Sequence, residues 1–124
     1  MATVHTPKKK LGDLLLAEVL PVWTKGAGTL LAGTSYKLGT VLARVSGKYQ
    51  ALDLAGTGAA KKAVAVLGED VDATDADVDS GVIIKRGAVV ALDALVWPEG
   101  ATEAQQATAI DELDSLGIVA AEWI

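Results

Sequence analysis

Glycine divides the apolar parts of this 124-residue sequence into short runs, a pattern that favours short strands joined by turns. Gly-Thr pairs recur at 28–29, 33–34, 39–40 and 56–57 with unequal spacing, so the glycines mark turns or strand starts rather than a structural repeat. The runs Thr40–Val45 and Lys48–Leu52 flank Ser46-Gly47, which predicts a β-hairpin. Further short strands are expected at Ala63–Leu67, Val82–Lys85, Ala88–Leu92 and Leu95–Trp97, the last ended by Pro98.

One helix is predicted near the C-terminus. Thr102 is a good N-cap and Gln105 lies three residues later, as a capping box requires. Gly117 is expected at the left-handed position after the last turn. The apolar face of this helix is expected to consist of Ala109, Ile110, Leu113 and Leu116, and Ile118–Ala121 to form a closing strand. The predicted fold class is α+β, mostly β: a small single domain with one main C-terminal helix.

The expected core is thin, because the apolar content comes mainly from alanine, valine and leucine. The chain has no phenylalanine, and its aromatic residues are Trp23, Tyr36, Tyr49, Trp97 and Trp123. A domain of this size with so few large side chains can gain stability from partner subunits. Trp97 beside Pro98 is interpreted either as an anchor for the helix or as the centre of an interface between subunits.

Several classes of function are disfavoured by counting residues. The chain has no cysteine and one histidine, His5, so thiolate chemistry, a serine–histidine–aspartate triad and polyhistidine metal sites are not expected. The acidic stretch Glu69–Asp79 has calcium-loop spacing at Asp75, Asp77 and Asp79, but Ser80 and Arg86 stand where such a loop needs glycine and glutamate. This stretch is therefore expected to be a solvated loop without a metal. We expect no enzymatic activity, no cofactor and no small-molecule substrate.

Charge is unevenly distributed along the chain, whose net charge is −5. Residues 1–62 carry a net charge of +6 and residues 63–124 a net charge of −11. This asymmetry indicates head-to-tail attraction between subunits, an acidic face that avoids acidic partners, or merely a solvated surface with chance clustering. Basic residues are scattered apart from Lys8–Lys10, and no apolar run approaches the ~20 residues needed to cross a bilayer. Neither a nucleic acid nor a membrane is expected as a partner.

The N-terminal segment differs from the rest of the chain. Residues 1–10 are polar, whereas residues 11–23 are apolar but contain Gly12 and Pro21, which allow a helix of about two turns or an extended segment. We expect residues 1–25 to be an arm that binds a partner, and residues 26–124 to fold without it. The expected contact residues are Leu14, Leu15, Leu16, Val19, Leu20, Val22 and Trp23.

Residues 28–119 contain a series of small-residue patterns: Gly39-Thr40-Val41-Leu42, Gly47-Lys48-Tyr49, Gly58-Ala59-Ala60, Val64–Leu67, Gly87 after an acidic linker, and Leu95-Val96-Trp97-Pro98-Glu99 followed by an alanine-rich helix. Together these patterns resemble the head decoration proteins of lambda-type bacteriophages. The sequence departs from the lambda protein in its more apolar N-terminal lead and its longer end, Ala121–Ile124. Contacts of the arm therefore cannot be transferred residue by residue.

The resemblance implies a structural virion protein on the outer surface of an expanded capsid. It implies homotrimers at local three-fold sites, binding to the major capsid protein through an N-terminal arm, and stabilisation of the shell against internal DNA pressure. Trp97 and Pro98 are the residues we expect in the trimer interface. Two alternatives remain: an adhesin or glycan-binding module would expose aromatic platforms on one face, and a small hydrolase would bring carboxylates with raised pKa values together in a concave site.

Overall fold

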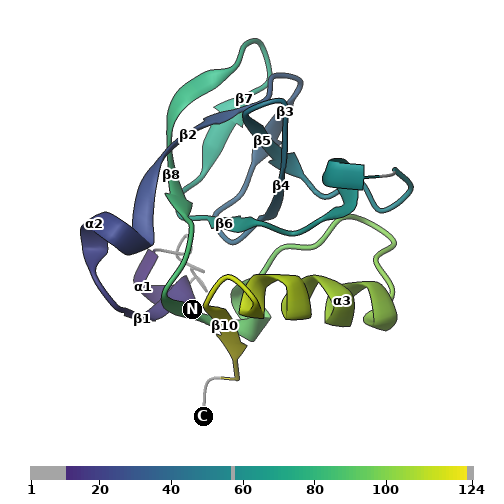
Figure 1. Ribbon diagram of the computed structural model, residues 1–124. Coiled ribbons are helices and arrows are strands. Elements are labelled where there is room, and N and C mark those ends of the chain that lie inside the picture. The colour runs from purple at the N-terminus through teal and green to yellow at the C-terminus, as the bar shows by residue number, and fades with distance from the viewer. Residues whose placement is uncertain (1–10, 57, 123–124) are drawn as a thin grey trace, which may run out of the picture.

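The computed structural model describes residues 11–56 and 58–122. Figure 1 shows a barrel of short strands at the top, the one long helix below it on the right, and a small sheet at the bottom. The strands are β1 (Leu15–Glu18), β2 (Lys25–Leu30), β3 (Thr34–Tyr36), β4 (Val41–Val45), β5 (Lys48–Ala51), β6 (Ala65–Leu67), β7 (Val71–Ala73), β8 (Val78–Ile84), β9 (Ala88–Ala91) and β10 (Ile118–Ala121). The helices are α1 (Leu11–Leu14), α2 (Pro21–Thr24) and α3 (Glu103–Asp114), with 3₁₀ turns η1 (Gly58–Lys61) and η2 (Leu92–Ala94). This mostly β architecture with one main helix confirms the predicted fold class.

Five strands close into a barrel in the order β2-β5-β4-β6-β8. The predicted hairpin is confirmed, because β4 pairs with β5 in antiparallel register from Leu42 opposite Ala51 to Val45 opposite Lys48. Its two turn residues, at positions 46 and 47, have φ values of 52° and 82°. Positive φ at both central positions gives the turn the twist that a two-residue hairpin requires, and glycine adopts it without steric cost.

The C-terminal helix has the predicted capping box. The Thr102 side chain accepts a hydrogen bond from the backbone N–H of Gln105, and the Gln105 side chain accepts one from the backbone N–H of Thr102. Gly117 has the expected left-handed conformation, with a φ of 80°, but it lies two residues beyond the C-cap Ser115 rather than directly after the cap. The predicted apolar face of the helix is buried only in part. Ala109 and Leu113 are buried, whereas Leu116 is 40% exposed.

Two expectations about strands need correction. The acidic stretch is not one solvated loop, because Val71–Ala73 forms β7 and pairs with β3, and β8 begins at Val78. The expected strand Leu95–Trp97 is reduced to a single bridge between Val96 and Thr40. In both places the partner strand is distant in the sequence, so local composition carries little information about the pairing.

The small sheet at the bottom has the order β1-β9-β10 and joins both ends of the described chain. Strand β1 runs antiparallel to β9, and β10 runs parallel to β9. Residues 11–23 therefore contain both of the conformations that the sequence allows: single helical turns in α1 and α2, with the strand β1 between them.

Two hydrophobic clusters form the core. One lies inside the barrel and contains Leu30, Tyr36, Leu42, Tyr49 and Ile83 among its members. The larger cluster joins side chains of the barrel, α3 and the small sheet. It includes Leu14, Val66, Val90, Leu113 and Ile118.

Candidate functional site

Helix α2 connects the small sheet to the barrel and is held at both ends by hydrogen bonds to the turn between β8 and β9. The backbone N–H of Val19 donates to the carbonyl of Gly87 at 2.9 Å. At the other end, the fully buried Thr24 donates from its Oγ1 to the same carbonyl at 3.1 Å, and its own carbonyl accepts from the backbone N–H of Lys85 at 2.8 Å. The chain between these anchors is fixed in place while several of its side chains remain exposed.

The anchored chain carries four large apolar side chains that are exposed. Val22 is 91% exposed, Val19 71%, Leu20 50% and Trp23 48%. We call these four residues the α2 apolar segment. Isolated exposed apolar residues are common, but a contiguous group on a fixed element is typical of an interaction site.

Two residues of the β8–β9 turn determine the place of the Trp23 ring: Arg86 contacts it and Gly87 leaves room for it. The guanidinium of Arg86 lies over the ring, 5.6 Å from its centroid, and donates to the Trp23 carbonyl at 2.7 Å. Gly87 has a φ of 60°, and a Cβ built there would overlap the ring. Glycine therefore leaves room for the indole at this position.

The structure separates the seven contact residues expected from the sequence into two groups. Leu14 is fully buried in the larger core cluster, and Leu15 and Leu16 are half-buried against that cluster. These three leucines hold the small sheet to the domain. The other four form the α2 apolar segment, so this second group is the one with large exposed apolar side chains.

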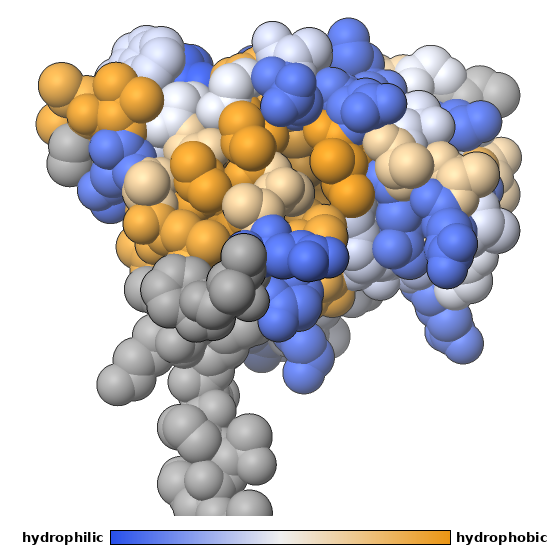
Figure 2. Space-filling model, turned by 90° about the horizontal axis from the view of Figure 1, so that it is seen from below, coloured by the Kyte–Doolittle hydropathy of each residue, from blue (hydrophilic) through white to orange (hydrophobic). Residues whose placement is uncertain are grey.

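Figure 2 shows hydrophobic residues gathered over the centre and left of the face seen from below. Figure 1 places β1 and β10 at this end of the molecule. Pairing aligns Ala17 of β1, Val89 of β9 and Val119 of β10 in one row, and Val119 is 41% exposed. This row was not predicted from the sequence. In the structure Val89 and Val119 each follow a buried residue, which is the alternation expected of strands that have one face turned outward.

Trp97 and Pro98 lie at the other end of α3 from Leu116. Trp97 is half-buried against the larger core cluster, so it anchors the loop before the helix and also keeps an accessible surface. It lines a hollow of about 380 Å³ with Leu92, Asp93, Leu95, Glu103, Gln106, Ala107 and Ile110. Two of these described lining residues are acidic and none is basic.

A second concave region, of about 440 Å³, lies between the barrel and the C-terminal end of α3. It is lined by Trp23, Arg44, Tyr49, Lys62, Val64, Lys85, Arg86, Ser115 and Leu116, and we call it the basic groove. Its four cationic side chains come from three separate parts of the chain, and none of its described lining residues is acidic. This cluster was not predicted, because its basic residues are scattered along the sequence.

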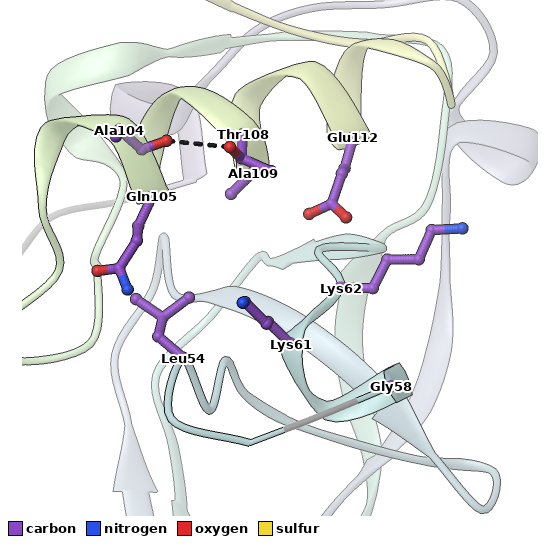
Figure 3. A pocket seen from close by; sticks show the side chains of 9 residues that line it. All are labelled: Leu54, Gly58, Lys61, Lys62, Ala104, Gln105, Thr108, Ala109 and Glu112. Atoms are coloured by element: carbon purple, nitrogen blue, oxygen red, sulfur yellow. Dashed lines mark hydrogen bonds between the residues drawn. The ribbon is translucent and has the colours of Figure 1, made fainter.

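A third cavity, of about 410 Å³, separates α3 from η1 (Figure 3). Lys61 and Lys62 come from the η1 side, and Glu112 projects from the helix. Glu112 is the one carboxylate among the described lining residues, and it accepts a hydrogen bond from the backbone N–H of Ala63 at 3.1 Å. A single carboxylate that already braces the backbone does not supply the acid–base pair that a hydrolase of this type requires.

In the acidic stretch, Asp77 binds groups from two other segments. Its Oδ1 accepts from the backbone N–H of Ala32 at 2.8 Å, and its Oδ2 lies 2.6 Å from the Nζ of Lys48. The hydrogen bond from Lys48 and then that from Ala32 lower the pKa of Asp77 below its ordinary value of 3.8. Within residues 11–56 and 58–122, no three acidic, histidine or cysteine side chains form a group that could hold a metal ion.

We expect this lowered pKa to make stability depend on pH in the acid range. A carboxylate that is bound in the folded state contributes stability above its ordinary pKa and loses that contribution as pH falls through the lowered folded pKa. Asp77→Asn should therefore flatten the decline of the melting temperature below about pH 4, followed by circular dichroism. Asp75→Asn removes a carboxyl group from the same loop and is the control. Equal acid sensitivity of Asp77→Asn and the parent chain would contradict the assignment.

The two alternative functions find little support in the described side chains. Tyr36 and Tyr49 are buried and Trp97 is half-buried, which leaves Trp23 as the one markedly exposed aromatic residue between positions 11 and 122, and Trp123 lies outside the described residues. The pKa values of Asp72 and Asp77 are both lowered, whereas a hydrolase acid needs a raised pKa. None of the helices described is long and apolar enough to cross a membrane.

Comparison with known proteins gives a family match over most of the chain. The family described as bacteriophage lambda head decoration protein D matches residues 4–118. No curated protein matches the chain. The matched range includes the barrel, the small sheet's first two strands, the α2 apolar segment and all of α3.

Proposed function

Because the chain belongs to the family of bacteriophage lambda head decoration protein D, we propose that it binds the expanded phage capsid as trimers at local three-fold sites and stabilises the shell against internal DNA pressure. The chain is a structural protein of the phage head, and its place is the outer surface of the capsid. The observation that carries the finer proposal is the extent of the family match, which spans nearly the whole described fold.

The α2 apolar segment is the part of the surface that we assign to the capsid. Its four side chains are exposed while the backbone on either side is anchored, so little conformational entropy is lost when a partner covers them. The row of Ala17, Val89 and Val119 adds further apolar side chains on the small sheet, whose strands β1 and β10 lie at the bottom of Figure 1. Residues 1–25 would act with this surface as the capsid-binding part of the chain, and residues 26–124 as the main body.

Trp97 and Pro98 are assigned to the contact between subunits. The indole combines an apolar surface with a hollow beside it, which is the arrangement that tryptophan has in many interface centres. No catalytic role and no cofactor are proposed: the described residues form no group of three metal ligands, and the one carboxylate among the described residues lining the cavity between α3 and η1 already accepts a hydrogen bond from the backbone.

Purified chain added to expanded heads that lack a decoration protein tests the proposal. We expect saturable binding, density for three copies around each local three-fold site by electron cryomicroscopy, and greater survival of DNA-filled heads on heating. Unexpanded shells are the control and should bind far less protein. Absence of binding, or density away from the three-fold sites, would overturn the proposal.

A further inference from the structure

The basic groove presents cations that are held in place. Arg44 lies over the ring of Tyr49 at 5.6 Å from its centroid, and Arg86 is held over Trp23 and bound to its carbonyl. Lys85 reaches the carbonyl of Ala27 at 3.4 Å. A concave cationic surface without an acidic residue in its described lining, on a chain whose net charge is −5, favours an acidic partner.

The surface around Trp97 has the opposite charge. Asp93 and Glu103 line the hollow beside Trp97, and the exposed Glu99 directly follows Pro98. We call Asp93, Trp97, Pro98, Glu99 and Glu103 together the acidic patch. It combines carboxylates with an apolar centre, as the basic groove combines cations with the exposed Leu116.

The two surfaces lie at opposite ends of α3. Ser115 and Leu116, which line the groove, follow the last residue of the helix, whereas Glu103 in the patch is its first residue. Twelve helical residues span about 18 Å, so the two surfaces can face different neighbours. Two complementary surfaces at different places on one protomer are what a head-to-tail contact requires, and such contacts close into a ring when the rotation between neighbouring copies allows it.

We propose that the basic groove of one copy binds the acidic patch of the next copy. This inference rests on the proposed trimer and names the surface that meets Trp97 and Pro98 across the subunit contact. A contact that set groove against groove or patch against patch would oppose like charges, and because the groove and the patch lie at opposite ends of α3 we assign them to two separate, head-to-tail contacts. Leu116 packs near the apolar centre of the patch, and the cations pair with its carboxylates.

Nucleic acid fits the groove less well than a second copy does. Stacking of bases requires open aromatic faces, but Tyr49 is buried beneath Arg44, and Arg86 lies over Trp23. The exposed carboxylates elsewhere on the chain would also repel a phosphate backbone. On a second copy, the carboxylates of the acidic patch instead supply the negative charge that complements the cations of the groove.

Charge reversal in the full-length chain tests the proposal. Arg44→Glu with Lys62→Glu reverses two exposed groove positions, and Asp93→Lys with Glu99→Lys reverses two exposed patch positions while leaving the first turn of α3 unchanged. We expect each double variant to weaken self-association at least about tenfold in sedimentation equilibrium at low salt.

Matched controls change exposed charges outside both surfaces. Lys37→Glu with Lys61→Glu, and Asp75→Lys with Asp111→Lys, make the same changes in net charge at exposed positions that line neither the groove nor the hollow beside Trp97. Both control variants should associate like the unmodified chain, which separates an effect of the contact from an effect of net charge.

The decisive experiment restores the complementary charges of the contact by combining both pairs of reversals. In a chain that carries all four reversals, the new groove carboxylates of one copy meet the new patch lysines of the next, so the copies should again form trimers. A mixture of the two double variants should form pairs but no closed ring of three, because three subunits cannot alternate. Trimers that survive either reversal, a fourfold-reversed chain that stays dissociated, or an unmodified chain that does not associate in solution or on capsids overturns the inference.

Capsid occupancy, measured in parallel, separates this inference from the proposed function. Absence of capsid binding by the unmodified chain overturns the function. Capsid-bound trimers of the unmodified chain that persist in both double variants leave the function standing and overturn the groove-to-patch contact.

Discussion

Leu14→Ala is expected to lower the free energy of unfolding by about 3–5 kcal/mol, because it empties a fully buried site in the larger core cluster. Chemical denaturation followed by tryptophan fluorescence measures the change. Leu20→Ala removes the same atoms from a half-exposed side chain and is the matched control, for which a change within about 0.5 kcal/mol is expected.

The packing of Leu14 also changes what we expect from truncation. Deletion of residues 2–24 would remove Leu14, the strand β1 that pairs with β9, and the buried Thr24 that anchors α2. We expect the shortened chain to lose cooperative unfolding, whereas the sequence alone favours a folded remainder. A truncated chain as stable as its parent, or a Leu14→Ala variant no less stable than Leu20→Ala, would show that residues 11–24 are an addition to a complete domain.

Local signals in the sequence predicted the elements whose defining hydrogen bonds are themselves local. The capping box joins residues three apart, and the hairpin turn needs only Ser46 and Gly47 in place. The pairings of β3 with β7 and of β2 with β8 join segments that are far apart in the chain. Nothing in the composition of one strand identifies so distant a partner. Strand β7 was missed because acidic residues surround Val71 and Ala73, its two buried positions, and acidic stretches are typical of loops.

The sequence indicated the candidate surfaces only where their residues are neighbours in the chain. The apolar content of residues 11–23 indicated that these side chains must be covered by something, but not whether by this domain or by a partner. Leu14 is buried and Val22 exposed because helical turns alternate with a strand, and that alternation depends on the pairing of β1 with β9. The basic groove was not predictable because Arg44, Lys62 and Lys85 meet only when the barrel closes.

Val19→Glu with Val22→Glu is expected to lower the affinity for expanded capsids by about 100-fold or more and to leave the domain's stability nearly unchanged. Each valine contributes up to about 1.5 kcal/mol when a partner covers it, and each new carboxylate must lose its hydration to enter the contact. Every 1.4 kcal/mol, roughly, corresponds to a tenfold change in affinity. The fold should tolerate both changes because the two side chains are largely exposed and the anchoring bonds of α2 come from the backbone and from Thr24.

Leu31→Glu with Thr34→Glu is the matched control for this variant, since it adds the same charge at exposed positions beyond the far end of β2. The length of β2 places this site about 20 Å from α2. Titration of capsids with each labelled protein, followed by sedimentation, gives the affinities, and thermal unfolding gives the stabilities. If both double variants bind equally well, the α2 apolar segment does not face the capsid. If both lose binding to the same degree, added negative charge rather than lost apolar contact is the cause, and the apolar docking surface must lie elsewhere on the molecule.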